Sequence, residues 1–153
     1  TYAGNPELLS RTHFARFLVE KNICKSTDEV FKNYLIEGKP GYIGHVWASL
    51  EESVQWITTA GGVAIIAHPG RYRLTDMQKH ELYEAFKLAG GKGIEVITGS
   101  HTPQQYDEYA KVALQYQFYA SRGSDFHDPA ESFIDLGRLP NLPSQLQPVW
   151  SLL

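Results

Sequence analysis

Cysteine is almost missing from this sequence of 153 residues, in which Cys24 stands alone. A single thiol excludes a disulfide within the chain and is typical of a reducing compartment, so we expect the protein in the cytoplasm. Long apolar runs are missing too: none approaches the roughly 18 residues that a membrane-spanning helix requires, so no membrane partner is expected. The first residues contain no basic and apolar leader, so no secretory signal is expected either.

An excess of charge of either sign is also missing. The formal net charge is -3 and 20% of the residues are charged, so no global basic field is available to hold nucleic acid. The sequence has no glycine-rich phosphate loop, dinucleotide fingerprint or nucleophile elbow. Contact with a polyanion must therefore come from a local basic cluster.

The first third of the sequence, residues 1–45, is predicted to form a small helical subdomain. Phe14, Phe17 and Leu18 follow the i, i+3, i+4 spacing of an amphipathic helix over residues 12–21, and we expect them to be buried. A Ser-Thr-Asp-Glu capping box then begins a second short helix.

The remaining residues, 46–153, alternate between predicted strands and helices. Strands are expected at 63–67, 94–97 and 118–120, with amphipathic, capped helices before and between them. Repeated strand–helix units are typical of a parallel α/β architecture. Three strands do not close a barrel, which takes about eight. Either the sheet is open, or further strands belong to sequence that this chain does not contain.

Side chains that bind metals follow two of the predicted strands. His68 comes after the first strand, and Asp125 and His127 come after the third. Because the carboxyl ends of parallel strands share one edge of a sheet, we expect these three side chains to converge there. Imidazole nitrogen and carboxylate oxygen bind Zn²⁺, Mn²⁺ or Fe²⁺, so the three form a partial metal site. The alternative is a solvated turn, because turn-forming glycine, serine and proline surround the Asp-x-His pair.

Basic residues gather at the start of the first predicted helix. Arg11, His13 and Arg16 could bind a phosphate there with the free backbone N–H groups and the helix dipole. Taken alone, however, these residues slightly favour an ordinary exposed basic helix end. Arg71 follows His68 closely, and either serves the same cleft or is solvated.

Two further residues lie on or just beyond the second predicted strand. His101 is either a substrate-binding or proton-transfer residue, or a loop histidine held by the backbone. Glu95 lies within the strand, where a buried charge needs a partner, and we assign it no role.

Several of these segments together resemble the PHP (polymerase and histidinol phosphatase) superfamily. They are residues 61–72, 93–96, 100–101 and 120–127. Residues 10–20 and 30–35 are similar to a bacterial branch that contains nucleoside 3′,5′-bisphosphate phosphatases and a 5′→3′ exoribonuclease. The combination is more specific than any one motif and covers most of the chain.

The resemblance implies a distorted (β/α)₇ barrel with a helical insertion and two or three Mn²⁺ or Zn²⁺ ions. His68, Asp125 and His127 match the late metal ligands, and the basic residues at the first helix match the insertion that binds a substrate phosphate. The opening His-x-His motif, the Asp-His pair and the Glu ligand of the family have no counterpart here. The chain therefore resembles a C-terminal half, and the missing N-terminal half is its expected partner.

The implied activity is metal-dependent hydrolysis of phosphate from 3′,5′-bisphosphonucleotides, or trimming of RNA from the 5′ end. The alternatives are a phosphatase for another phosphomonoester, such as histidinol phosphate, and a catalytically incomplete phosphate-binding fragment. We expect this chain alone to be inactive and to self-associate if its sheet edge stays unpaired.

Overall fold

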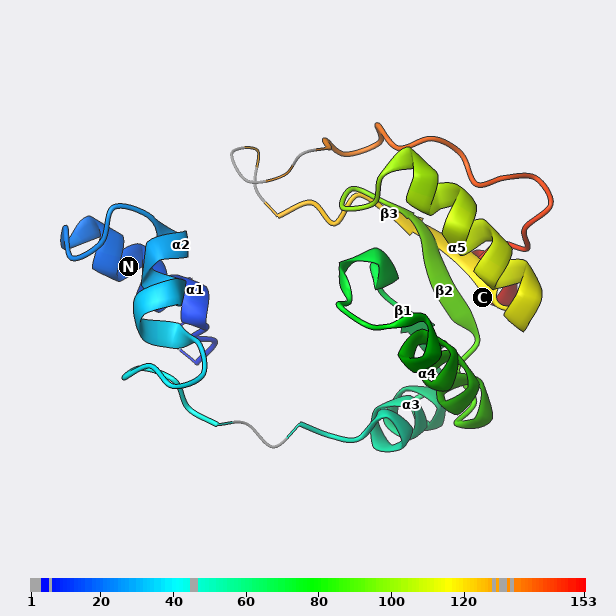
Figure 1. Cartoon of the computed structure of the whole chain (residues 1–153), viewed down its shortest axis with the longest axis horizontal. Coiled ribbons are helices and arrows are strands. Elements are labelled where there is room, and N and C mark those ends of the chain that lie inside the picture. The colour runs from blue at the N-terminus through cyan, green and yellow to red at the C-terminus, as the bar shows by residue number, and fades with distance from the viewer. Residues whose placement is uncertain (1–3, 6, 45–46, 128, 130–131, 133) are drawn as a thin grey trace. The chain divides into compact units, whose positions relative to one another are not determined.

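The computed structural model describes residues 4–5, 7–44, 47–127, 129, 132 and 134–153. The chain divides into two compact units, Thr1–Trp47 and Ala48–Leu153 (Figure 1). The expected boundary between residues 45 and 46 lies outside the described residues. No helix in the described part of the chain combines the length and the apolar character that crossing a membrane would need.

The first unit is helical and has a small core. It contains α1 (Arg11–Glu20), α2 (Thr27–Val30) and the π-helical turn η1 (Phe31–Leu35). The Ser26 hydroxyl accepts a hydrogen bond from the Glu29 backbone N–H at 3.2 Å, so α2 begins where the capping pattern predicted. The buried residues of this unit are Ala15, Cys24, Val30 and Leu35.

The buried face of α1 differs from the prediction. Phe14 and Phe17 are 52% and 43% exposed, whereas Ala15 is buried and Leu18 and Val19 pack against the core. Both stripes follow i, i+3, i+4 spacing and share Leu18, so periodicity alone could not decide between them. The helix therefore buries Ala15 with Leu18 and Val19, and the two aromatic rings remain near the surface.

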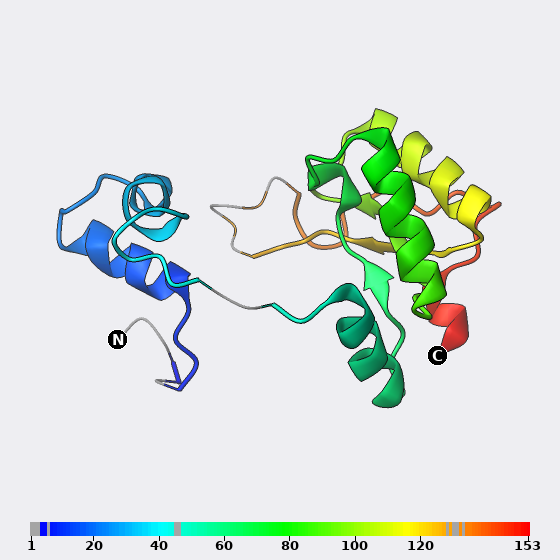
Figure 2. The same ribbon diagram turned by 60° about the horizontal axis from the view of Figure 1, so that its bottom comes forward.

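The second unit contains a parallel three-stranded sheet in the order β1-β2-β3 (Figures 1 and 2). Its strands are β1 (Ile65–Ile66), β2 (Gly93–Thr98) and β3 (Tyr119–Gly123), and its helices are α3 (Leu50–Thr59), α4 (Asp76–Leu88) and α5 (Pro103–Tyr116), with short 3-10 turns η2 (Pro69–Arg71) and η3 (Val149–Leu152). The strand–helix alternation agrees with the predicted parallel α/β class. Within the described residues the sheet is open and does not close into a barrel.

The helices of this unit begin at capping residues. Ser49, Thr75 and Thr102 each accept a hydrogen bond from the backbone N–H three residues later, and the side chain of that later residue returns one to the cap. In the returning bond the Glu or Gln side-chain oxygen accepts from the backbone N–H of the capping residue, so these bonds satisfy N–H groups that the first turn leaves unpaired. For α5 the consequence is positional, because its start is fixed directly after the carboxyl end of β2.

The core of the second unit lies between the sheet and the helices α4 and α5. Ile94 and Val96 of β2 are completely buried, and Tyr109 of α5 is nearly so. Phe86 and Phe118 meet edge to face with ring centroids 5.8 Å apart. This packing holds the three strands rigidly, so the loops at their carboxyl ends start from fixed points.

Candidate functional site

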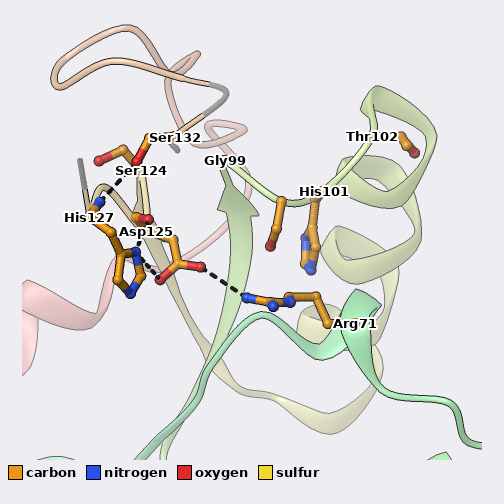
Figure 3. A pocket seen from close by; sticks show the side chains of 9 residues that line it. Arg71, Gly99, His101, Thr102, Ser124, Asp125, His127 and Ser132 are labelled. Carbon is orange, nitrogen blue, oxygen red and sulfur yellow. Dashed lines mark hydrogen bonds and ion pairs between the residues drawn. The ribbon is translucent and has the colours of Figure 1, made fainter. Parts of the chain in front are cut away.

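A cavity of about 620 Å³ lies at the carboxyl edge of the sheet (Figure 3). It is lined by Arg71, Gly99, Ser100, His101, Thr102, Ser124, Asp125, His127 and Ser132. Most of these residues follow directly after β2 or β3, and Arg71 ends the turn after β1. Ligand sites in open parallel sheets lie at this edge, so the cavity is the candidate functional site.

Gly99 brings the ends of two strands together. A Cβ atom at this position would lie 2.2 Å from the backbone carbonyl oxygen of Ser124. Only glycine therefore allows the segments after β2 and β3 to approach this closely.

Asp125 connects two of the predicted site residues. Its carboxylate lies 3.4 Å from the Arg71 guanidinium, and its backbone carbonyl lies 2.7 Å from Nδ1 of His127 (Figure 3). Since a carbonyl can only accept, Nδ1 carries the hydrogen in this bond, and Nε2 is the second ring nitrogen. Asp125 has a left-handed backbone with φ of 54°, which turns the chain sharply as β3 ends.

The segment after β3 is also tied to Ser132, whose hydroxyl accepts a hydrogen bond from the His127 backbone N–H at 2.9 Å. No pattern in the sequence points to this residue, because the region after Pro129 has no helical or strand periodicity.

His68 is held at the end of β1 in a different environment. Its backbone is left-handed, with φ of 32°, and its N–H donates to the Glu95 carboxylate at 2.6 Å. Its ring atom Nδ1 is buried and makes no hydrogen bond. Such an orphaned nitrogen is unfavourable unless another group satisfies it, and a metal ion is one such group.

The three predicted metal ligands do not form a cluster within the described residues. Asp125 and His127 are brought together, but no group of three His, Cys, Asp or Glu side chains in the described ranges could hold a metal ion. The Asp125 carboxylate faces Arg71 instead. The donor chemistry fits a metal such as Zn²⁺ or Mn²⁺: His68 has an orphaned ring nitrogen, His127 a free Nε2 and Asp125 a carboxylate. A complete centre needs further ligands from elsewhere.

Glu95 has the partner that a buried charge requires. Burial raises the pKa of its carboxyl group, and repulsion from Asp125 adds to this, while the hydrogen bond from the His68 N–H acts in the opposite direction. The sequence showed that a partner was needed, but it could not show that the partner is a backbone group 27 residues away.

His101 lines the cavity but uses both ring nitrogens on the backbone. Nδ1 lies 3.1 Å from the Val96 carbonyl oxygen, and Nε2 accepts from the Gly70 N–H at 2.9 Å. The residue is 5% exposed and its ring stacks on Tyr109. Burial lowers its pKa. A proton-transfer residue needs a free ring nitrogen, so this arrangement argues against that hypothesis and favours the alternative of a histidine held by the backbone.

The predicted phosphate-binding residues Arg11, His13 and Arg16 lie on α1 in the first unit. Nδ1 of His13 accepts a hydrogen bond from the Ser10 backbone N–H at 2.9 Å, so the ring caps the helix. The Arg11 guanidinium lies 5.9 Å from the centre of the Phe31 ring. That the three residues bind an anion stays a prediction. An unexpected apolar cavity of about 590 Å³ lies in this unit, lined in part by Arg11, Phe14 and Phe17.

Comparison with known proteins gives several curated relatives, two of which are described here, while no family model matches the chain. It is 48% identical over 149 residues to a 3′,5′-nucleoside bisphosphate phosphatase from Chromobacterium violaceum, which covers 97% of this chain and 52% of the relative. It is 40% identical over 144 residues to the 5′-3′ exoribonuclease Rnm of Escherichia coli, covering 94% of this chain and 49% of the relative. The chain thus spans about half the length of these relatives.

A solved structure agrees with this result. An amidohydrolase from Chromobacterium violaceum, with bound sulfate and no metal, superimposes with a TM-score of 0.83 at 48% identity. The match covers 97% of this chain and 51% of that one. The relatives confirm the resemblance on which the sequence analysis relied.

Proposed function

This chain belongs to the branch of the PHP superfamily that includes bacterial 3′,5′-nucleoside bisphosphate phosphatases and 5′-3′ exoribonucleases, and we therefore propose that it forms about half of a metal-dependent phosphoesterase acting on nucleotides. The cavity at the carboxyl edge of the sheet is its proposed phosphoester site. The observation that carries this proposal is the grouping of Arg71, Asp125 and His127 around one cavity.

Each of these side chains has a proposed task. Arg71 binds and orients the phosphoryl group, because a guanidinium presents a planar fork of donors that matches phosphate oxygens. His68, Asp125 and His127 would hold divalent metal, Mn²⁺ or Zn²⁺, with ligands from the rest of the complete protein. When bound, the metal would polarise the phosphoryl group and lower the pKa of an attacking water.

The helical unit supplies the proposed selectivity for a second phosphate. Arg11 and Arg16 are cationic, and His13 is fixed by Ser10 so that only Nε2 is left to contact an anion. The substrate that we propose for the complete protein is a 3′,5′-bisphosphonucleotide, because the Chromobacterium violaceum relative carries that substrate in its name.

A second candidate is exoribonuclease activity from the 5′ end, which the name of the Escherichia coli relative favours. RNA trimming requires a surface that stacks successive bases as well as a phosphate pocket. The half-exposed rings of Phe14 and Phe17, beside Arg11, are candidates for that contact.

The substrate can be tested with the complete protein in the presence of Mn²⁺. We expect phosphate release from a 3′,5′-bisphosphonucleotide, with slower or no release from histidinol phosphate. Mononucleotide release from 5′-phosphorylated RNA would favour the second candidate. Turnover of histidinol phosphate alone would contradict both.

A further inference from the structure

In the turn η2 after β1, both the backbone N–H and the backbone carbonyl of Gly70 form hydrogen bonds with side chains. Gly70 donates its N–H to Nε2 of His101 at 2.9 Å, and its carbonyl oxygen accepts from the Gln105 side-chain amide at 3.3 Å. Both side chains come from the segment after β2. A Cβ atom at Gly70 would lie 2.6 Å from Gln105 and 2.8 Å from the His101 ring, so the close contact requires glycine.

The His101 ring is itself immobilised in one hydrogen-bonded form. The Val96 carbonyl can only accept, so Nδ1 carries the hydrogen, and Nε2 is the acceptor for Gly70. Stacking on Tyr109, with centroids 4.8 Å apart and planes 24° apart, fixes the ring plane. A buried ring with both nitrogens satisfied is a rigid link between β2 and the turn.

That turn follows one proposed site residue, His68, and ends with another, Arg71. His68 has a strained left-handed backbone, which persists only where neighbouring groups hold it, and its N–H is bonded to Glu95. Two residues further on, His101 holds Gly70. Arg71 directly follows this restrained residue in the chain. Its side chain extends toward Asp125 across the cavity (Figure 3).

We propose that His101 is a positioning residue: its neutral imidazole clamps Gly70 and thereby places the Arg71 guanidinium opposite Asp125. The consequence for turnover rests on the proposed phosphoesterase function. Both ring nitrogens of His101 are bonded to the backbone, so we assign it an action through the turn and not on the phosphoester itself. Loss of the clamp would let the turn drift, and displacements near 1 Å at a positioning group can cost about 100-fold in rate.

Two substitutions in the complete protein separate the bond of His101 to Gly70 from its bond to Val96. In His101→Gln the side-chain oxygen takes the place of Nε2 and can still accept from Gly70. In His101→Asn the amide takes the place of Nδ1, so the bond to Val96 survives and the bond to Gly70 is lost. His80→Asn is the control, because His80 is an exposed histidine on α4, outside the cavity lining, whose Nδ1 bonds the Tyr116 hydroxyl.

We expect His101→Asn to lower kcat/KM for a 3′,5′-bisphosphonucleotide by about 100-fold. His101→Gln should retain most of the activity, and His80→Asn should match the wild type. Equal losses in the Asn and Gln variants at equal melting temperatures would overturn the proposal. If His101→Asn fails to fold, Gln105→Glu replaces it, because this variant keeps the acceptor that caps α5 but loses the donor to Gly70. Unchanged kcat/KM in Gln105→Glu would then overturn it.

Hydrogen exchange of the Gly70 amide separates this inference from the proposed function. The amide should exchange faster in His101→Asn than in the wild type or His101→Gln, whether or not the protein turns over the nucleotide. If the wild-type protein has no phosphatase activity, the proposed function is wrong, but the proposed role of His101 in holding Gly70 is not affected. Equal exchange rates of the Gly70 amide in all variants would show that His101 does not hold the turn.

Discussion

Single side chains build this site chiefly by holding backbone atoms in place. Glu95 accepts from the N–H of His68, His101 accepts from that of Gly70, and Ser132 accepts from that of His127. Each bond fixes a residue next to, or identical with, one that we propose to bind metal or phosphate. A polar group that is removed from water is costly without a partner, and each of these bonds supplies one while it orients the backbone of the site.

The charge of Glu95 should lower the stability of the fold at neutral pH. Burial, the largest influence, raises its pKa, so the folded state binds a proton more readily than the unfolded state. The stability that protonated Glu95 adds to the fold is therefore complete below the ordinary pKa of a glutamic acid. It is lost as the pH rises through the raised pKa of Glu95 in the folded state. We expect Glu95→Gln to withstand more denaturant than the wild type at neutral pH, with the difference shrinking in acid.

Urea titrations of both proteins at the two pH values would measure this effect. A Gln variant that is less stable than the wild type at neutral pH would show that the charged hydrogen bond to His68 outweighs burial.

The elements position the site because the ends of neighbouring strands are packed closely. The contact between Gly99 and the Ser124 carbonyl joins the segments after β2 and β3, and the capped start of α5 at Thr102 follows at once. Gly99 and Ser124 both line the cavity, so the shape of the cavity depends on this contact.

Gly99→Ala should force these two segments apart. Its methyl group would meet a backbone oxygen that cannot rotate away, and overpacking of this kind costs about 1–3 kcal/mol. We expect the free energy of unfolding to fall by that amount and the phosphatase activity of the complete protein to fall with it. Gly44→Ala is the control, since a Cβ there has nothing within 4 Å. Equal stability of the two variants would contradict the account.

Elements with local signals were predicted well from the sequence, and contacts between distant segments were not. Capping residues at Ser49, Thr75 and Thr102 gave the helix starts, because those bonds span three residues. Strand β1 is shorter than its apolar run, since pairing with β2 covers only Ile65 and Ile66. The predicted buried face of α1 was wrong at Phe14 and Phe17, because two overlapping apolar stripes that share Leu18 were equally periodic.

For the candidate site, too, the sequence predicted the local features and not the contacts between distant segments. Parallel strands predicted that residues after β1, β2 and β3 meet at one edge, and Arg71, His101, Asp125 and His127 do line one cavity there. The direction of each side chain depends on left-handed residues and on hydrogen bonds such as those of Glu95 and His101. No local pattern encodes these long-range contacts.

At the scale of the whole molecule, the chain consists of two units with unequal cores and spans about half the length of its relatives. The helical unit buries four residues in its described core, whereas the core of the sheet unit includes most of β2 and the inner faces of α4 and α5. The proposed metal centre is incomplete within the described residues. An incomplete centre agrees with our proposal that the chain forms about half of a larger phosphoesterase.

Residues 1–153 alone should therefore show no appreciable phosphatase activity. The two donors brought together, Asp125 and His127, are fewer than the metal ligands that hydrolysis requires. Assays of the purified 153-residue chain and of the complete protein, at equal concentration with Mn²⁺, would check this expectation. Robust metal-dependent turnover by the shorter chain would contradict it and would direct attention to Glu95 as a further ligand.

In our proposal, the cavity around Asp125 is the phosphoester site of the complete protein. Its most direct test is phosphate release from a 3′,5′-bisphosphonucleotide by the wild type and by Asp125→Asn, with the exposed Asp107→Asn on α5 as the control. Asn preserves the shape of Asp125 but removes the charge that faces Arg71 and that would bind metal. We predict a loss of about 100-fold or more in kcat/KM for Asp125→Asn and no loss for Asp107→Asn. Wild-type kinetics in Asp125→Asn would contradict the account.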